Sequence, residues 1–136
     1  MGSNLFQNGI LLLDGAMGTV LQQRGLPPGG QPELLNLTDP ELLASVYREY
    51  VEAGSQVIYA NTFGANRLKL SRSGHAVAEV VTAAVSAAKR AAGGRALTAL
   101  DVGPLGEPLE PMGSLTFERA YELFREMMTA GAAAGA

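Results

Sequence analysis

The 136-residue chain contains no cysteine. Its sequence therefore offers no disulfide framework, no thiol nucleophile and no thiolate ligand for a metal ion. It has one histidine, His75, which precedes an apolar helical pattern and is expected to be exposed near the start of that helix. One histidine without cysteines cannot form a metal site, so none is predicted from these residues.

Basic clusters and long hydrophobic runs are also missing. The formal net charge is −3, and no basic stripe is interleaved with aromatic residues, which argues against a nucleic-acid surface. The longest apolar runs are interrupted by Glu79 and Lys89 and fall short of the roughly twenty residues of a membrane span. The N-terminus has no secretory signal pattern. We therefore expect one globular domain over residues 1–136, with no second domain, in the cytoplasm, and with a small-molecule partner.

Predicted strands and helices alternate along the chain. Apolar runs at 10–13 and 57–60, and a third that ends at Asp101, predict strands, of which the first is expected to be buried on both faces. Helical periodicity follows each strand, at 40–53, 75–92 and 116–131. This order predicts parallel βαβ units and the α/β class. Periodicity alone leaves open whether the sheet forms a barrel or an open doubly wound fold.

The helix boundaries and the end of the chain carry further predictions. Asp39 is expected to cap the first long helix, with Pro40 at its first position, and Thr116 to cap the last one. A fourth strand is expected after Gly131, but the sequence ends in "AAAGA". Because a (β/α) barrel takes about 250 residues, we expect a fragment, or a short gene product whose sheet another polypeptide closes. The last helix is expected to bury Phe117, Ala120, Tyr121, Phe124, Met127 and Met128, the two methionines by packing rather than by contact with a cofactor.

Polar residues stand where each predicted strand ends, namely Asp14, Asn61 and Asp101. Ligands of parallel α/β folds bind beyond the carboxyl ends of the strands. A carboxylate there can hold an ammonium group, and the backbone amides of the turn 15–17 can hold a carboxylate. The pattern therefore predicts a site that grips an amino acid by both of its charged ends.

A purely structural interpretation of these residues stays open. "DGAMG" can be a tight turn capped by its aspartate, and Asn61 and Asp101 can satisfy backbone groups at the strand ends. A phosphate-binding loop is disfavoured, since the segment has neither Gly-x-Gly-x-x-Gly spacing nor a Gly-Lys-Ser/Thr ending.

Four segments together resemble a known family. "LLLDGAMGTVLQQRG", "PELLNL", "YVEAGSQVIYANTFGANRLKL" and "DVGPLGEPLEPMGSLTFERAYELFREMM" are similar, in order and spacing, to the N-terminal half of the homocysteine S-methyltransferase domain. Within that family the similarity is greatest to the homocysteine-binding module of cobalamin-dependent methionine synthases. It covers nearly the whole chain. The resemblance implies the first three βα units of an eight-stranded (β/α) TIM-type barrel.

The resemblance also implies an activity and a set of residues. The family transfers a methyl group to the homocysteine thiol, which is activated by a zinc ion held by three cysteines from late strands. No cysteine is present here, and a family glutamate after the fourth strand is missing too. By resemblance Asp14 binds the substrate ammonium, the amides of Gly15 and Ala16 receive its carboxylate, and Asn61 and Asp101 line the mouth. Catalytic residues are not identified, and the isolated chain is expected to be inactive.

The methyl donor depends on parts of the polypeptide outside this sequence. The "GPLGEPLEPMG" loop favours the cobalamin-dependent branch, which uses methylcobalamin and methyltetrahydrofolate through corrinoid- and folate-binding modules. One alternative is a cobalamin-independent relative with S-methylmethionine or a betaine as donor. Another is a non-catalytic half-barrel that associates with itself through its open edges. An unrelated α/β nucleotide-binding domain is a third.

Overall fold

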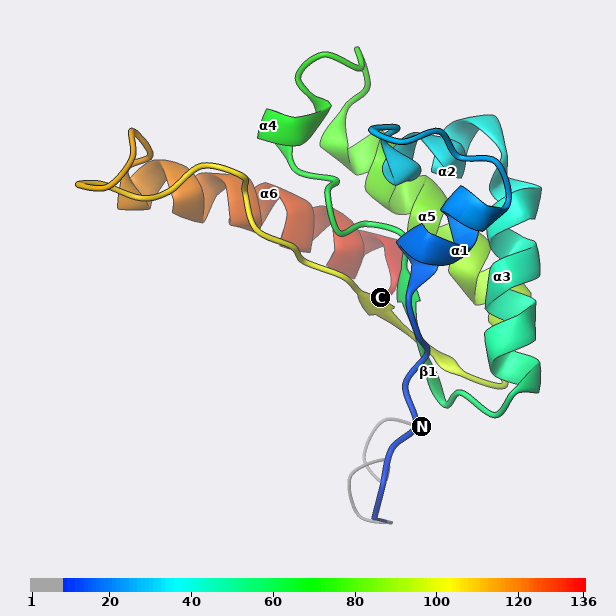
Figure 1. Ribbon diagram of the computed structural model, residues 1–136. Coiled ribbons are helices and arrows are strands. Elements are labelled where there is room, and N and C mark those ends of the chain that lie inside the picture. The colour runs from blue at the N-terminus through cyan, green and yellow to red at the C-terminus, as the bar shows by residue number, and fades with distance from the viewer. Residues whose placement is uncertain (1–8) are drawn as a thin grey trace.

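The computed structural model describes residues 9–136 and shows an α/β fold (Figure 1). Three long helices and two short strands carry most of the structure, and four further helical segments of three to seven residues connect them. In chain order the elements are α1 (Met17–Gln23), η1 (Pro32–Leu34), α2 (Leu35–Thr38), α3 (Pro40–Glu52), β1 (Val57–Ala60), α4 (Arg67–Leu70), α5 (Val77–Ala92), β2 (Leu97–Leu100) and α6 (Phe117–Ala134). The predicted α/β class is confirmed.

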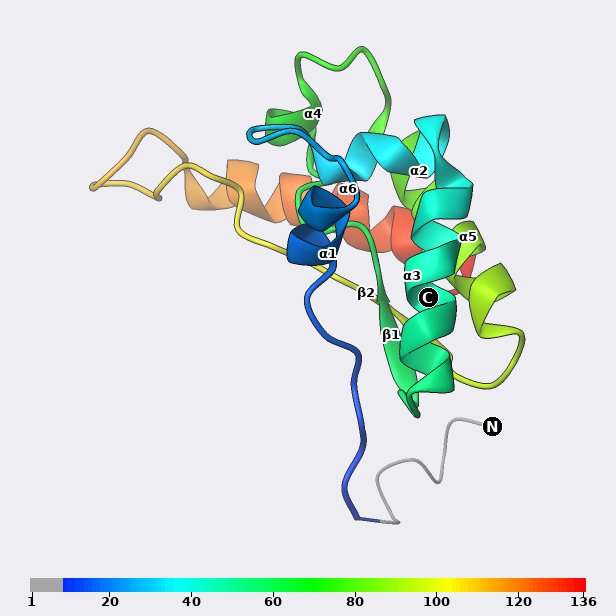
Figure 2. The same ribbon diagram turned by 45° about the vertical axis from the view of Figure 1, so that its right-hand side comes forward.

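The two strands form a parallel sheet, with Val57 opposite Leu97 and Ala60 opposite Leu100. The segment before α1 runs along the other edge of β1 (Figure 2), where Leu13 forms a single parallel bridge with Val57. Next to this bridge the amide of Asp14 donates a hydrogen bond of 3.0 Å to the carbonyl of Val57. The strands predicted at 57–60 and before Asp101 are therefore present, in parallel.

The prediction of a strand at 10–13 that is buried on both faces is wrong. This segment pairs with β1 only near its end, and its side chains are largely exposed, 94% for Ile10 and 43% for Leu13. Only Leu11 of this segment is partly buried, so most of its apolar side chains are not covered by any of the residues 9–136. An apolar run shows that a segment suits burial, but burial also needs a partner surface.

The core lies on the helical side of the sheet. α5 contacts both strands and is flanked by α3 and α6, and α3 lies beside it in both views (Figures 1 and 2). Ile58 of β1 and Val80 and Val85 of α5 are completely buried there, and burial of each such side chain contributes about 1.5–3 kcal/mol. α3 begins as predicted, with Pro40 at its first position and the Asp39 carboxylate accepting a hydrogen bond from the amide of Leu42.

The last helix confirms its predicted cap, and it confirms its predicted buried face only in part, at Ala120 and Met127. The hydroxyl of Thr116 accepts a hydrogen bond from the amide of Arg119. The buried face consists of Ala120, Leu123, Met127, Ala130 and Gly131, whereas Phe117, Tyr121 and Met128 are exposed and Phe124 is half-buried. α6 carries apolar side chains on two faces at helical spacing, and periodicity cannot tell which of them meets α5.

Gly131 does not end this helix, and no fourth strand follows it within the described residues. A Cβ atom at Gly131 would lie 2.6 Å from the Leu100 side chain of β2. The glycine is therefore needed for the close approach of α6 to the sheet, and the helix continues to Ala134.

The short helices were not predicted. α1 begins inside the "DGAMG" turn, and α4 is capped by the Asn66 side chain, which accepts a hydrogen bond from the amide of Lys69. Such elements are too short to show a hydrophobic period. None of the helices in the described part of the chain has the length and apolar character of a membrane span.

Candidate functional site

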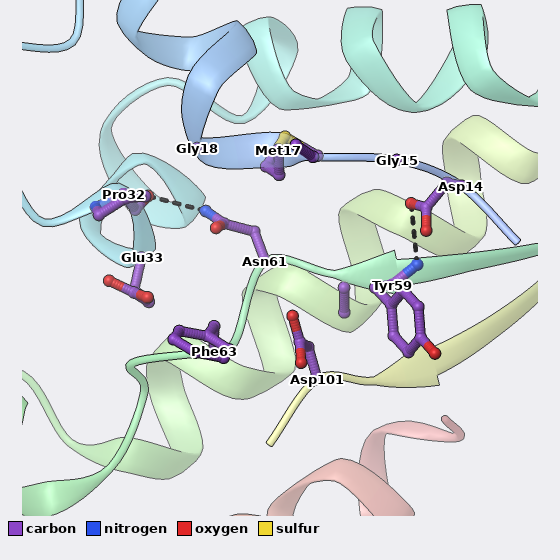
Figure 3. Close-up of a pocket in the computed structure, with 12 residues that line it drawn as sticks. Asp14, Gly15, Met17, Gly18, Pro32, Glu33, Tyr59, Asn61, Phe63 and Asp101 are labelled. Atoms are coloured by element: carbon purple, nitrogen blue, oxygen red, sulfur yellow. Dashed lines mark hydrogen bonds between the residues drawn. The ribbon is translucent and has the colours of Figure 1, made fainter. Parts of the chain in front are cut away.

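A cavity of about 240 Å³ lies at the carboxyl end of β1 (Figure 3). All five predicted site residues, Asp14, Gly15, Ala16, Asn61 and Asp101, line it, and they come from three separate segments of the chain. The remaining lining consists of Met17, Gly18, Pro32, Glu33, Tyr59, Ala60 and Phe63. The structure thus brings the predicted residues together, while their binding roles stay predictions.

Asp14 bonds to the strand beside it rather than to its own turn. Its Oδ2 accepts a hydrogen bond of 3.0 Å from the amide of Tyr59, a position that a backbone carbonyl would occupy in a continuing parallel ladder. Its Oδ1 is buried and accepts no hydrogen bond from any described residue. Burial raises the pKa of Asp14, the Tyr59 amide partly opposes this, and the charge of Asp101 adds to the increase. One oxygen of this carboxylate is therefore an unsatisfied acceptor among the described residues.

The turn after Asp14 is held from the helical side. The Tyr50 hydroxyl donates a hydrogen bond of 3.1 Å to the carbonyl of Ala16. A Cβ atom at Gly15 would lie 2.9 Å from that hydroxyl oxygen, so a larger residue at position 15 displaces the Tyr50 side chain. Ala16 stands at the N-cap of α1 without a side-chain cap, so the first amides of this helix have no side-chain acceptor.

Asn61 links the end of β1 to the neighbouring helical segments through hydrogen bonds. Its Nδ2 donates to the carbonyl of Pro32 at 2.7 Å and to Oδ1 of Asn36 at 3.1 Å. Its backbone amide donates to the Tyr47 hydroxyl at 2.8 Å. The expectation that this side chain satisfies backbone groups at the strand exit is therefore confirmed, and Asn61 ties η1 and α3 to the strand end.

Asp101 is positioned through its backbone. The Thr62 hydroxyl donates to the carbonyl of Asp101 at 2.8 Å and accepts from the amide of Asp101 at 3.0 Å. Thr62 is fully buried, so this contact fixes the ends of β1 and β2 relative to each other. Burial raises the pKa of the Asp101 carboxyl group, and the nearby charge of Glu33 raises it further.

Glu33 is the acidic wall residue that the sequence analysis did not identify. It is only 7% exposed, and its Oε1 accepts a hydrogen bond of 2.7 Å from the amide of Gly64. A Cβ atom at Gly64 would lie 2.7 Å from the same oxygen, so the contact requires glycine. The two residues are 31 positions apart, and no local pattern connects them. The only signal in the sequence is that both residues lie in segments that resemble the family, Glu33 in "PELLNL" and Gly64 in "NTFGAN".

The cavity is acidic. Asp14, Glu33 and Asp101 line it, and no lysine, arginine or histidine does. Within residues 9–136 neither these three carboxylates nor any other three histidine, aspartate or glutamate side chains form a group that could hold a metal ion. The arrangement therefore favours a ligand with a positively charged group, such as an ammonium.

Comparison with known proteins gives a consistent result. The family model for homocysteine S-methyltransferase matches residues 11–136. Methionine synthases of Mycobacterium leprae (strain TN) and Mycobacterium tuberculosis (strain ATCC 25618 / H37Rv) are each 43% identical over 65 residues, which is 42% of this chain and 5% of theirs. The homocysteine methyltransferase MmuM from Escherichia coli, in its oxidized form, superposes with a TM-score of 0.83 at 25% identity.

The MmuM match covers 97% of this chain and 52% of the solved chain. The metallated form of the same enzyme gives a TM-score of 0.84 at 23% identity, and 54% of that chain is covered. This chain thus spans about half the length of the solved structure, whose α/β fold it shares, and a small part of the curated methionine synthases. The matched residues include every lining residue of the cavity. The chain belongs to the homocysteine S-methyltransferase family.

Proposed function

We propose that this chain is the homocysteine-binding part of a methyltransferase that converts homocysteine to methionine. The observation that carries the proposal is the acidic cavity, in which the buried Oδ1 of Asp14 lacks a hydrogen-bond donor among the described residues and which the turn 15–16 also lines, without a side-chain cap on α1. These two features offer opposite charges to one small ligand. Family membership supports homocysteine as that ligand.

Each end of the amino acid has its own partner in this proposal. Asp14 accepts the α-ammonium group, which replaces the donor that Oδ1 lacks. The amides of Gly15 and Ala16 receive the α-carboxylate, and the Tyr50 hydroxyl holds their turn in place. Asp101 adds a second negative charge on the ammonium side, and Asn61 keeps the wall of the mouth in position.

Thiol activation is not provided by the described residues. The family uses a zinc ion, which promotes ionisation of a coordinating thiol near neutral pH. This chain has no cysteine and its acidic residues form no metal-ligand group within 9–136, so they do not fit a thiolate zinc site. We therefore expect the chain alone to bind homocysteine without transferring a methyl group.

The same proposal covers the complete barrel to which this chain would belong and its methyl donor. The chain would form the first three βα units of a (β/α)8 barrel in a cytoplasmic enzyme, and the single bridge between Leu13 and Val57 supports a first strand at this edge in the complete barrel. Similarity to methionine synthases supports methylcobalamin and methyltetrahydrofolate as donors, delivered by corrinoid- and folate-binding modules. A donor such as S-methylmethionine or a betaine is the alternative, which the fold similarity to a homocysteine methyltransferase supports equally.

A second candidate function is a half-barrel that associates with itself. Its support is the exposed apolar surface of the sheet edge and of α6, which includes Ile10, Leu12, Leu97, Phe117 and Tyr121. Sedimentation of the purified chain tests this candidate, because a concentration-dependent dimer would favour it and a monomer that binds homocysteine would remove it.

The binding proposal is tested by calorimetric titration of L-homocysteine into the chain and into Asp14→Asn. Loss of one charged partner is expected to weaken binding by about tenfold or more. Asp39→Asn is the matched control, because it makes the same change at an exposed helix cap where asparagine serves equally well. Equal affinity of the chain and Asp14→Asn would contradict the proposed role of Asp14.

A further inference from the structure

A second cavity, of about 860 Å³, adjoins the first. Pro32, Glu33 and Phe63 line both cavities and so form a shared wall between them. Figure 3 shows these three residues together on one side of the first cavity. The far side of the second cavity is built from the loop 29–31 and from residues 68–72, at and after α4. The two cavities are therefore neighbours that share the Phe63 side chain.

The charge of this second cavity is opposite to that of the first. Lys69 and Arg72 line it, and Glu33 is its only acidic lining residue. One oxygen of Glu33 is already used by the amide of Gly64. Among the ion pairs of residues 9–136 none involves Lys69 or Arg72, whereas neighbouring Arg67 is paired with Glu126. Two cations without an acidic partner thus face one cavity.

Lys69 is held in place there. Its ammonium lies 5.3 Å from the centroid of the Phe63 ring, within the range of a cation–π contact. Its backbone carbonyl accepts a hydrogen bond of 2.7 Å from the Gln31 side chain, which joins the loop 29–31 to α4. The Asn66 cap fixes the start of the same helix. These contacts hold Lys69 and the loop 29–31 in position relative to each other, which reduces the entropic cost of binding at this wall of the cavity.

We propose that this second cavity is a binding site for an oxyanion, either a carboxylate or a phosphate, carried by a second small molecule. Lys69 supplies a fixed positive charge, and Arg72 supplies a planar guanidinium suited to two parallel hydrogen bonds with either group. The rest of that molecule would extend along Phe63 toward the acidic cavity. The proposal does not depend on homocysteine as the ligand of the first cavity.

The test uses two probes, inorganic pyrophosphate and glutarate, titrated separately into the chain while backbone amide NMR shifts are followed. Shifts are expected for residues 29–31, 63–64 and 68–72. Lys69→Met is expected to weaken binding of the effective probe by about tenfold. Lys89→Met is the matched control, because Lys89 is the only other lysine of the chain and contacts the distant carbonyl of Gly135.

Each outcome decides the proposal. Binding of pyrophosphate alone assigns a phosphate ligand, binding of glutarate alone assigns a carboxylate ligand, and binding of both that Lys69→Met weakens supports an oxyanion site that accepts either group. Binding of neither probe, or equal weakening by the two lysine substitutions, overturns the proposal. L-homocysteine titrated into Lys69→Met is expected to bind as it does to the unaltered chain, so failure of the oxyanion site and failure of the acidic site are distinguishable.

Discussion

The two faces of the short sheet differ in what covers them. On one face α5 lies across both strands, and Ile58 of β1 is completely buried. The next residue, Tyr59, points to the opposite face, is 37% exposed and lines the acidic cavity. The covered face thus contains the core, while the open face and the carboxyl ends of the strands present the candidate site.

The covered layer nevertheless determines the geometry of the site. Tyr47 of α3, fully buried beneath the sheet, accepts the amide hydrogen of Asn61, and Tyr50 of the same helix holds the turn after Asp14. A helix that never enters the cavity therefore positions two of its walls. The packed helical layer holds the walls of the cavity in place, so that polar atoms without a hydrogen-bond partner can persist on the open side of the sheet.

The largest expected effect is on the core. Ile58→Ala should lower the free energy of unfolding by about 2–5 kcal/mol, since it removes buried methyl groups and leaves a cavity beneath α5. Leu97→Ala, a comparable truncation at an exposed position of β2, should cost about 1 kcal/mol or less. Urea denaturation of both variants measures the contrast. Similar decreases in the free energy of unfolding for the two variants would mean that the open face of the sheet is covered in solution.

A smaller effect is expected at the link between core and site. Tyr47→Phe leaves the buried amide of Asn61 without its acceptor and should cost about 1–3 kcal/mol. Tyr121→Phe removes the hydroxyl of an exposed tyrosine on α6 and should be close to neutral. Homocysteine affinity should fall only in Tyr47→Phe, and unchanged affinity there would show that α3 does not position the site.

The smallest effect concerns pH. Burial raises the pKa values of Asp14 and Asp101 above the value of 3.8 that applies to the unfolded chain. Between the ordinary aspartate range and neutral pH the folded state therefore binds more protons than the unfolded chain. The free energy of unfolding should increase as the pH falls through this range. Asp14→Asn should reduce this dependence and slightly stabilise the chain at pH 7. Thermal unfolding at several pH values checks the sign, and a loss of stability in this window would contradict it.

The sequence predicted the long elements and the convergence of the strand ends, but not what covers each surface. Caps at Asp39 and Thr116 are local signals, and both are present. The outward position of Tyr121 and the exposure of Ile10 depend on which partner surfaces exist, which no local pattern encodes. Glu33 was not predicted as a site residue for the same reason, because its place in the cavity wall depends on a hydrogen bond from the amide of Gly64, which lies far along the chain.

The central claim is that the acidic cavity recognises both charged ends of an amino acid. The most direct measurement is parallel calorimetric titration of the chain with L-homocysteine, 4-mercaptobutanoate, which lacks the ammonium, and 3-aminopropane-1-thiol, which lacks the carboxylate. We predict measurable binding of homocysteine and about tenfold or greater loss with each analogue. Equal affinity for all three compounds would contradict the claim, because binding would then depend on the shared thiol chain and not on the charged groups.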